Sequence, residues 1–245
     1  MRDSPMNEIV FCPQLHIIFQ LFLRRTLVRS VLSCSMILLL VSCDNKTQIH
    51  SDKKPLKDYS VAKEIPLTRK GIPVLFYRLS KNVSYQLNLD SLELGFDSLQ
   101  IRLWLDCSVK SYKRLFVLSN SNNNWSGVEY EYASEWIEKA DSERLLSQTN
   151  QIITPELGWN KFMDSLNRLD IYNLPDMYSV KGMVPLALDG DYYFLEIANK
   201  EKYKFCIYSN LDYYLDKKEW PASNMAKIID LFSHEFGFDC GTLSK

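Results

Sequence analysis

The sequence predicts a single α+β domain, in which an antiparallel sheet, formed by a meander and a hairpin, packs with about two helices. Three observations support this. Hydrophobic residues alternate with other residues between positions 99 and 133, in segments separated by polar turns. A hairpin pattern occupies residues 191–209. Apolar residues recur at helical spacing in the segments 155–169 and 221–236.

The predicted meander comes first in the chain. Residues 72–79, IPVLFYRL, have the composition of a strand. In the next segment, LQIRLWLDC, alternation would place Arg102 and Trp104 on the polar side of the sheet. The predicted strands are 72–79, 99–107, 113–119 and 125–133, with an asparagine-rich turn at 119–124.

Two helices and a hairpin complete the predicted domain. Thr154 and Pro155 form a suitable cap and first-turn pair for the first helix. The hairpin pairs 191–197 with 202–209. The last helix would begin near Pro221 or Ser223 and end at about Phe236, before Gly237. The apolar helical positions are Trp159, Phe162, Met163, Leu166 and Leu169 in the first helix and Met225, Ile228, Ile229, Phe232 and Phe236 in the last.

An N-terminal segment precedes this domain and has the pattern of a signal peptide. Residues 24–29 (RRTLVR) are basic, and residues 30–42 form an apolar run of the ~7–15-residue class found in signal peptides. This run is shorter than the ~20 residues of a membrane-spanning helix. Residues 1–23 do not fit the pattern, so either the start site is assigned too far upstream or the leader is long and amphipathic.

The end of the apolar run, Leu40-Val41-Ser42-Cys43, resembles the lipobox of bacterial lipoproteins. The resemblance implies that residues 1–42 are removed as a signal peptide and that Cys43 carries the lipid. The alternative is a plain signal peptide or short anchor with a chance cysteine. Residues 43–64 would then be the lipidated cysteine and a flexible tether, rich in lysine, and residues 65–245 the α+β domain. The expected location is the cell envelope, lipid-anchored, with the domain outside the cytoplasm.

The part of the chain after the lipobox is also similar to uncharacterised secreted or envelope proteins. That resemblance implies one α+β domain and no particular activity. The residues that carry it are Arg102-Leu103-Trp104, Trp125, the segment 155–168, and Asp189-Gly190 with Tyr192 or Tyr193 before Glu196.

Composition excludes several classes of function. A net charge of −1 provides no basic footprint for nucleic acid. The strings GxGxxG, GxxxxGK[ST] and GxSxG are absent, so no common nucleotide cradle or nucleophile elbow is predicted. A zinc motif HExxH beginning at His234 would need histidine at position 238, where phenylalanine stands. We therefore expect no cofactor and no metal site.

The candidate catalytic residues are Glu129, Glu131 and His234. On a strand, Glu129 and Glu131 would share a face about 6.5–7 Å apart, close to the ~5–9.5 Å between glycosidase carboxylates. The competing interpretation places both on the wet face of the sheet, opposite Arg102 or Arg114. His234, near a helix end, could serve in hydrolysis, although histidines there are usually half-exposed.

The candidate binding residues are Trp104 and Trp125, which could line a sugar-binding face. Tryptophan is, however, also an ordinary packing residue in sheets. The favoured function is a non-enzymatic binding or interaction module held at the membrane by its lipid, with an unknown protein or glycan partner. The alternatives are an envelope hydrolase that uses His234 or the Glu129/Glu131 pair, and an inhibitor or immunity-type lipoprotein.

Three cysteines follow the lipobox: Cys107, Cys206 and Cys240. Since Cys107 and Cys206 both fall in predicted strands, they could form a cross-strand disulfide in an oxidising compartment. Buried free thiols are equally compatible with the sequence.

Overall fold

The structure is a computed structural model that describes residues 61–107, 110–183 and 190–239, all within one compact unit. The α+β class is confirmed, but the sheet has seven strands and the described residues form four α-helices. The strands are β1 (Ala62–Glu64), β2 (Leu99–Asp106), β3 (Lys113–Ser121), β4 (Asn124–Ile137), β5 (Ser142–Ile153), β6 (Tyr192–Asn199) and β7 (Lys202–Ser209). The helices are α2 (Leu75–Gln86), α3 (Trp159–Arg168), α4 (Leu211–Asp216) and α5 (Trp220–Phe236).

The order of strands in the sheet is β1-β7-β6-β2-β3-β4-β5. Every neighbouring pair is antiparallel except β1 and β7, which run parallel. The hairpin strands β6 and β7 therefore do not stand apart from the meander, because β6 pairs along its whole length with β2. The predicted leader, Cys43 and the tether up to residue 60 lie outside the described residues. The sheet already includes residues 62–64, which the sequence analysis placed in the tether.

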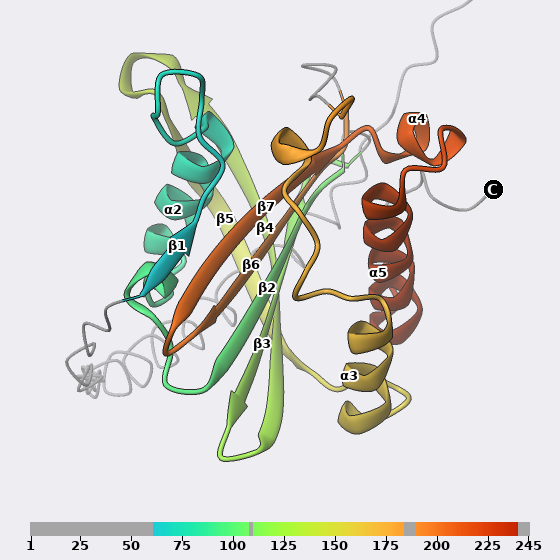
Figure 1. The fold of residues 1–245 in the computed structure, drawn as a ribbon. Coiled ribbons are helices and arrows are strands. Elements are labelled where there is room, and N and C mark those ends of the chain that lie inside the picture. The colour runs from blue at the N-terminus through green and yellow to red at the C-terminus, as the bar shows by residue number, and fades with distance from the viewer. Residues whose placement is uncertain (1–60, 108–109, 184–189, 240–245) are drawn as a thin grey trace, which may run out of the picture. The chain divides into compact units, whose positions relative to one another are not determined.

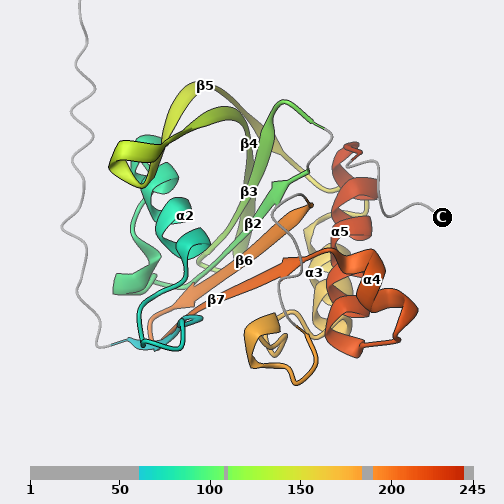
Figure 2. The same cartoon turned by 90° about the horizontal axis from the view of Figure 1, so that it is seen from above.

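Helices cover both faces of the sheet (Figures 1 and 2). On one face α2 packs through Phe76 and Tyr77, which contact Tyr192 and Phe205. On the other face lie α3 and α5, where Phe116 of β3 is the centre of an aromatic cluster. This cluster contains Phe116, Phe162, Phe232, Phe236 and Phe238. The central strands are thus buried on both sides.

The sheet bends around α2 (Figure 2). A register shift between Ala133 and Ser134 marks a bulge in β4, and bulges increase the local bend of a strand. Gln86, at the end of α2, holds the bent strand β5 in place. Its amide nitrogen donates to the Glu143 carbonyl at 2.8 Å, and its amide oxygen accepts from the Leu145 backbone N–H at 2.8 Å.

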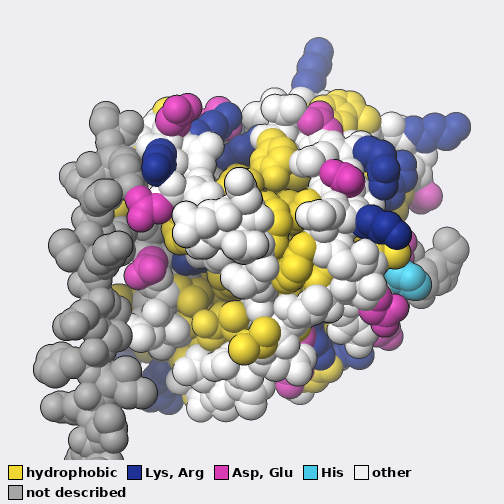
Figure 3. All heavy atoms as spheres, turned by 90° about the horizontal axis from the view of Figure 1, so that it is seen from below, with side chains coloured by type: hydrophobic (Ala, Val, Ile, Leu, Met, Phe, Trp, Pro, Cys, Tyr) yellow, Lys and Arg dark blue, Asp and Glu magenta, His cyan; other side chains and the backbone are white. Residues whose placement is uncertain are grey.

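Helix α2 does not cover the whole concave face. Its twelve residues span ~18 Å, whereas the twelve residues of β5 span ~40 Å. The side chain of Ile152, near the far end of β5, is consequently 87% exposed. Seen from below the view of Figure 1, the surface has hydrophobic side chains gathered near its centre (Figure 3).

A buried ionic cluster joins α2 to the sheet, and we call it the Glu196 cluster: Lys81, Arg102, Trp104, Glu196 and Tyr203. Glu196 is fully buried. Its Oε1 accepts from Trp104 Nε1 at 2.7 Å, and its Oε2 accepts from Lys81 Nζ at 3.0 Å and from the Tyr203 hydroxyl at 2.9 Å. Burial acts to raise the pKa of Glu196, but Lys81 and Arg102 outweigh it, so the pKa lies below its usual value.

The prediction of a strand at 72–79 is wrong, since residues 75–86 form α2. The buried residues of this helix are Tyr77, Ser80, Val83 and Ser84, which recur at helical spacing. The predicted strand segment 72–79 overlaps α2 over only five residues, 75–79, which is little more than one helical turn, and Arg78 is the only charged residue among them. A run this short does not distinguish a strand from a helix.

The first predicted helix begins later than expected. Thr154 and Pro155 do not cap it; a turn closes instead through the bond from Gly158 N–H to the Pro155 carbonyl at 2.9 Å. Helix α3 begins at Trp159, with Gly158 before it at a φ of 76°. Strand β5 and the short helix α4 were not predicted. The second half of β5, SQTNQII, is an exposed edge with no alternating apolar residues that would reveal it.

Several local predictions are confirmed. The strands at 99–107, 113–119 and 125–133 and the hairpin at 191–209 are present, although β4 extends further, to Ile137. The asparagine-rich turn is a tight hairpin in which Asn122 and Asn123 have φ of 52° and 64°. Helix α5 ends at Phe236, before Gly237, whose φ of 68° terminates it.

Candidate functional site

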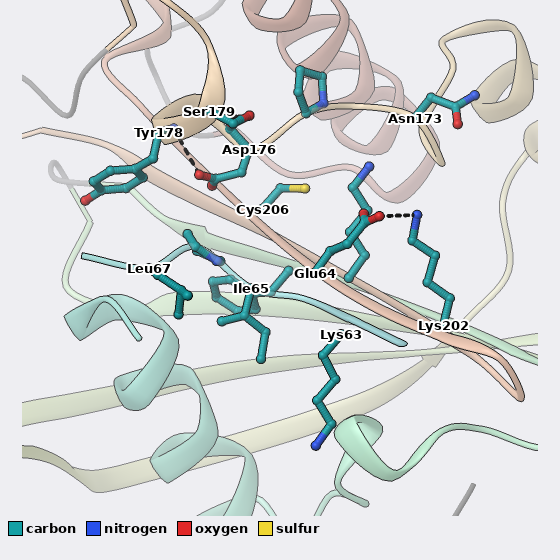
Figure 4. A pocket seen from close by; sticks show the side chains of 14 residues that line it. Lys63, Glu64, Ile65, Leu67, Asn173, Asp176, Tyr178, Ser179, Lys202 and Cys206 are labelled. Carbon is teal, nitrogen blue, oxygen red and sulfur yellow. Dashed lines mark hydrogen bonds and ion pairs between the residues drawn. The ribbon is translucent and has the colours of Figure 1, made fainter. Parts of the chain in front are cut away.

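A cavity of about 710 Å³ lies at the β1–β7 edge of the sheet (Figure 4). Its walls come from β1 and the segment after it, from β7, and from the loop that contains the short 3₁₀ helix η4 (Met177–Ser179). The lining residues are Lys63, Glu64, Ile65, Pro66, Leu67, Asn173, Pro175, Asp176, Tyr178, Ser179, Lys202, Lys204, Phe205 and Cys206. We call this space the edge cavity.

The edge cavity forms because β1 is short. Its pairing with β7 ends at Glu64, opposite Lys204, and the chain then turns away through Pro66. Further along β7, Asp176 takes the place of a neighbouring strand. Its Oδ1 accepts from the Ile207 backbone N–H at 2.8 Å, and its Oδ2 accepts from the Tyr178 N–H at 2.9 Å at the start of η4. Asp176 therefore ties the loop to the sheet edge and keeps the cavity open between them.

Charged groups of both signs line the edge cavity. Lys202 Nζ and Glu64 Oε1 form an ion pair at 2.7 Å. Lys204 is buried, with 8% exposure, and its ammonium donates to the Tyr172 carbonyl at 3.0 Å. An ammonium has three donors, so Lys204 can donate further bonds into the cavity. Lys63 points away from the other lining side chains in Figure 4.

Asp176 is the titratable carboxyl group of this site. Burial raises its pKa to about 6, although the N–H bonds from Ile207 and Tyr178 and the nearby Lys204 act in the opposite direction. Below this pH the carboxyl group becomes neutral and the charge of the lining rises by one unit. The electrostatic potential in the edge cavity therefore becomes more positive as the pH falls through about 6.

Cys206 lies at the floor of the cavity, between β7 and the loop (Figure 4). It is a free, fully buried thiol, and burial raises its pKa to about 12. Its Sγ lies 3.4 Å from the Leu174 carbonyl, to which it donates. Since the thiolate is the nucleophilic form, this cysteine is unreactive at neutral pH. Cys107 is disulfide-bonded, so the predicted bridge between Cys107 and Cys206 is wrong, and Cys240 lies outside the described residues.

The lining is suited to holding a ligand. The segment after β1 provides an apolar wall with Ile65, Pro66 and Leu67, and the loop and β7 add Pro175 and Phe205 to the lining. The acidic side chains of the lining have most of their acceptors occupied, because the oxygens of Asp176 receive two backbone N–H bonds and Glu64 pairs with Lys202. The spare capacity is in the donors of Lys204. A volume of this size lies within the ~300–1,000 Å³ typical of small-molecule sites.

The predicted pair Glu129 and Glu131 lies elsewhere, in a polar hollow of about 420 Å³ beside the end of α5. Arg114 binds both carboxylates: it pairs with Glu129, and its second nitrogen lies 3.0 Å from Glu131. Gln151 donates to the remaining oxygen of Glu129 at 2.7 Å. The expectation of an opposing Arg114 is confirmed. The expectation that Arg102 faces the two glutamates is wrong, because Arg102 lies on the α2 face of the sheet.

The description of this pair as two glutamates on a wet face is wrong for Glu129 and holds for Glu131. Glu129 is only 2% exposed, because the end of α5 covers it, whereas the Glu131 side chain is 41% exposed. His234 is exposed near the end of α5 and lines neither the polar hollow nor the edge cavity. The structure therefore does not bring the three catalytic candidates into one site.

The predicted binding residue Trp104 is buried, at 1% exposure, and belongs to the Glu196 cluster. The prediction that it lies on a polar, accessible side is wrong because α2 covers that face. Trp125 is half-buried and stacks on Trp159 of α3, with ring centres 6.4 Å apart. The pattern residues Arg102, Trp104 and Glu196 do converge, but beneath α2 rather than at a surface.

Sequence reasoning missed the edge cavity. One available signal was the alternation of Lys202 and Lys204, which places two cations on one face of a strand. A second was the Asp176-Met-Tyr-Ser sequence, in which an aspartate precedes a turn as a cap. Neither signal shows that the two segments meet, because 25 residues lie between Asp176 and Lys202 along the chain.

The chain matches no protein family, no curated protein and no solved structure with which it was compared. In the described part of the chain, no group of three or more histidine, cysteine, aspartate or glutamate side chains is arranged to hold a metal ion. Nor does any described helix have the length and hydropathy needed to cross a membrane.

Proposed function

We propose that this protein is a lipid-anchored component of a bacterial cell envelope and that its domain is a non-enzymatic binding module. The observation that carries the second part is the edge cavity, whose groups are suited to hold a ligand rather than to react with it. Its thiol is protonated at neutral pH, and its two carboxylates are engaged by backbone N–H groups and Lys202.

The ligand that fits this lining has an acidic group joined to an apolar part. The acidic group would accept hydrogen bonds from the Lys204 ammonium, and the apolar part would cover the wall that contains Ile65 and Leu67. Such chemistry occurs in free organic acids and at the acidic ends of peptides or glycans. The alternative of a hydrolase at Glu129 and Glu131 has less support, because Arg114 binds both carboxylates.

The test of the cavity uses hexanesulfonate, an anionic probe with an apolar chain, and hexylammonium as the probe of opposite charge. In calorimetric titrations we expect saturable binding of hexanesulfonate only. Lys204→Met preserves the length of the side chain but removes the charge, and it is expected to weaken binding at least tenfold, in line with a charged hydrogen bond of ~1.5–3 kcal/mol. Lys200→Met, in the β6–β7 turn outside the cavity, is the matched control and should bind as the wild type does.

The affinity for hexanesulfonate should also depend on pH. As Asp176 is protonated near pH 6, one negative charge leaves the cavity, so affinity should rise about threefold to tenfold between pH 7.5 and pH 5. Asp176→Asn should remove this rise. Equal binding of the two probes, or a titration that Lys204→Met leaves unchanged, would reject the edge cavity as the site.

The anchor has a separate test, the intact mass of the protein isolated from membranes. The wild type is expected to have the mass of residues 43–245 plus acyl chains, and Cys43→Ala should lose both the added mass and the membrane association. Two or more acyl chains hold a protein firmly, at ~0.8 kcal/mol per buried methylene. An unmodified mass that is insensitive to the substitution would contradict the lipoprotein assignment.

A further inference from the structure

The segment between β1 and α2 forms an ordered, exposed loop with a basic tip, which we call the Leu67–Ile72 loop. Leu67 and Pro73 form an isolated bridge at its base. Inside it, Thr68 N–H donates to the Ile72 carbonyl at 2.8 Å, and Gly71 N–H donates to the Thr68 carbonyl at 2.9 Å. The Thr68 hydroxyl accepts from Ile72 N–H at 3.2 Å. The loop stands at the upper end of α2 in Figure 1.

Large apolar side chains are unusually concentrated here. Leu67 is 52% exposed, Ile72 is 54% exposed and Leu75, the first residue of α2, is 38% exposed. The exposed tip between them consists of Arg69 and Lys70, and no acidic residue occurs from position 65 to position 75. Neighbouring apolar and basic side chains on one exposed surface are typical of a contact with an anionic lipid surface.

The position of the loop in the chain points to the same partner. Val61, where the described domain begins, follows Cys43 by eighteen positions, so the connecting segment can reach at most ~60 Å. If Cys43 carries the lipid, this limit keeps the domain beside the bilayer. The loop follows β1 within a few residues, and its internal hydrogen bonds mean that little conformational entropy is lost on docking.

We infer that the Leu67–Ile72 loop docks on the anionic bilayer to which the protein is anchored, with Ile72 in the interface and Arg69 and Lys70 at the lipid headgroups. This inference rests on the proposed lipid anchor, but it does not depend on the edge cavity. Such docking would fix the orientation of the domain relative to the membrane. Without it, a domain held by the tether alone could rotate freely.

The test uses the full lipidated protein, reconstituted into vesicles of phosphatidylcholine with phosphatidylglycerol. Ile72→Cys provides a thiol for an environment-sensitive nitrobenzoxadiazole label, and Tyr85→Cys, at a residue 84% exposed near the other end of α2, provides the matched control. The unsubstituted chain, labelled in parallel, measures background from its own thiols. We expect the label at position 72 to shift to the blue and to be quenched by bromine-substituted lipids, and the label at position 85 to remain in water.

Charge provides a second measurement. Arg69→Gln with Lys70→Gln, in the chain labelled at position 72, should lower the ratio of docked to undocked protein tenfold to thirtyfold, since each basic residue near an anionic surface contributes about fivefold to the docking equilibrium. Vesicles of phosphatidylcholine alone should have a similar effect. Neither change touches the lining of the edge cavity.

The outcomes separate the docking from the anchor. A protein that floats with the vesicles but shows no shift at position 72 would overturn the docking and leave the anchor intact. A shift that appears only after an envelope protein is added would assign the loop to a protein partner and overturn the lipid contact. If the wild type does not float with the vesicles at all, the anchor fails, and the docking inferred from it fails as well.

Discussion

Glu196→Ala is expected to reduce the free energy of unfolding by about 3–5 kcal/mol, the range measured when one partner of a buried ion pair is removed. Glu196 is fully buried and accepts three hydrogen bonds, from Trp104, Lys81 and Tyr203. Its loss would leave the indole N–H of Trp104 and the Tyr203 hydroxyl without an acceptor. It would also remove the carboxylate that acts most strongly on the charge of Arg102, which is 1% exposed.

Urea unfolding followed by circular dichroism measures this effect, with Glu135→Ala as the matched control. Glu135 pairs with Arg144 between β4 and β5, but the two side chains are 39% and 64% exposed, so we expect a change of less than ~1 kcal/mol. Glu196→Gln retains the shape and can still accept one hydrogen bond, and it should fall between the two. A cost for Glu196→Ala no larger than that for Glu135→Ala would contradict the role of the Glu196 cluster in holding α2 to the sheet.

The stabilisation due to Glu196 should also depend on pH. Because the folded-state pKa lies below its usual value, the stabilisation is complete above the ordinary glutamate range and is lost as the pH falls through the folded-state pKa. The difference in stability between the wild type and Glu196→Gln should therefore diminish in acid.

Phe116→Ala is expected to cost about 3–5 kcal/mol through loss of packing, the range for large aromatic residues in cores. Phe116 is fully buried in β3, and its ring centre lies 5.3 Å from that of Phe232, 5.5 Å from that of Phe236 and 5.1 Å from that of Phe238. The substitution would open a cavity where α5 meets the sheet. Phe232 and Phe236 belong to α5, and both rings also contact Phe162 of α3, so they cannot close the cavity fully.

Thermal and urea unfolding of Phe116→Ala provide the measurement. Tyr85→Ala, which truncates an aromatic side chain that is 84% exposed, is the control and should change stability by less than ~0.5 kcal/mol. Hexanesulfonate binding by the folded fraction of Phe116→Ala should match the wild type, because Phe116 does not line the edge cavity. A cost below ~1 kcal/mol would mean that α5 repacks freely on the sheet.

Where an element depends on neighbours in the chain, the sequence was sufficient to predict it. The hairpin turn at Asn122 and Asn123 requires left-handed backbone conformations that asparagine tolerates. The end of α5 at Gly237 has the same local origin. In contrast, residues 72–79 were assigned to a strand because a short apolar segment fits either period, and only packing against Tyr192 and Phe205 favours the helix.

The candidate site shows the same division. Glu129, Glu131 and Arg114 were correctly brought to one face, since strand periodicity and pairing are local rules. The burial of Trp104 was not predictable, because the helix that covers it comes from residues 75–86 and its hydrogen-bond partner is Glu196. An alternating strand indicates that two faces exist, but it does not indicate whether a helix lies on the second one.

By itself, the sequence determined the α+β class, most strand positions, the terminal helix and the lipobox pattern that predicts an anchor at Cys43. Only the tertiary structure decided which charged side chains are buried together and where a ligand could bind. The edge cavity joins residues of β1, the loop at Asp176 and β7, segments that lie far apart along the chain. Their meeting depends on the parallel pairing of β1 with β7 and on the bond from the Ile207 N–H to Asp176. Both contacts are made only when the whole sheet has assembled. Hydrophobic periodicity describes residues within one segment, so it cannot predict contacts between segments that are far apart in the sequence.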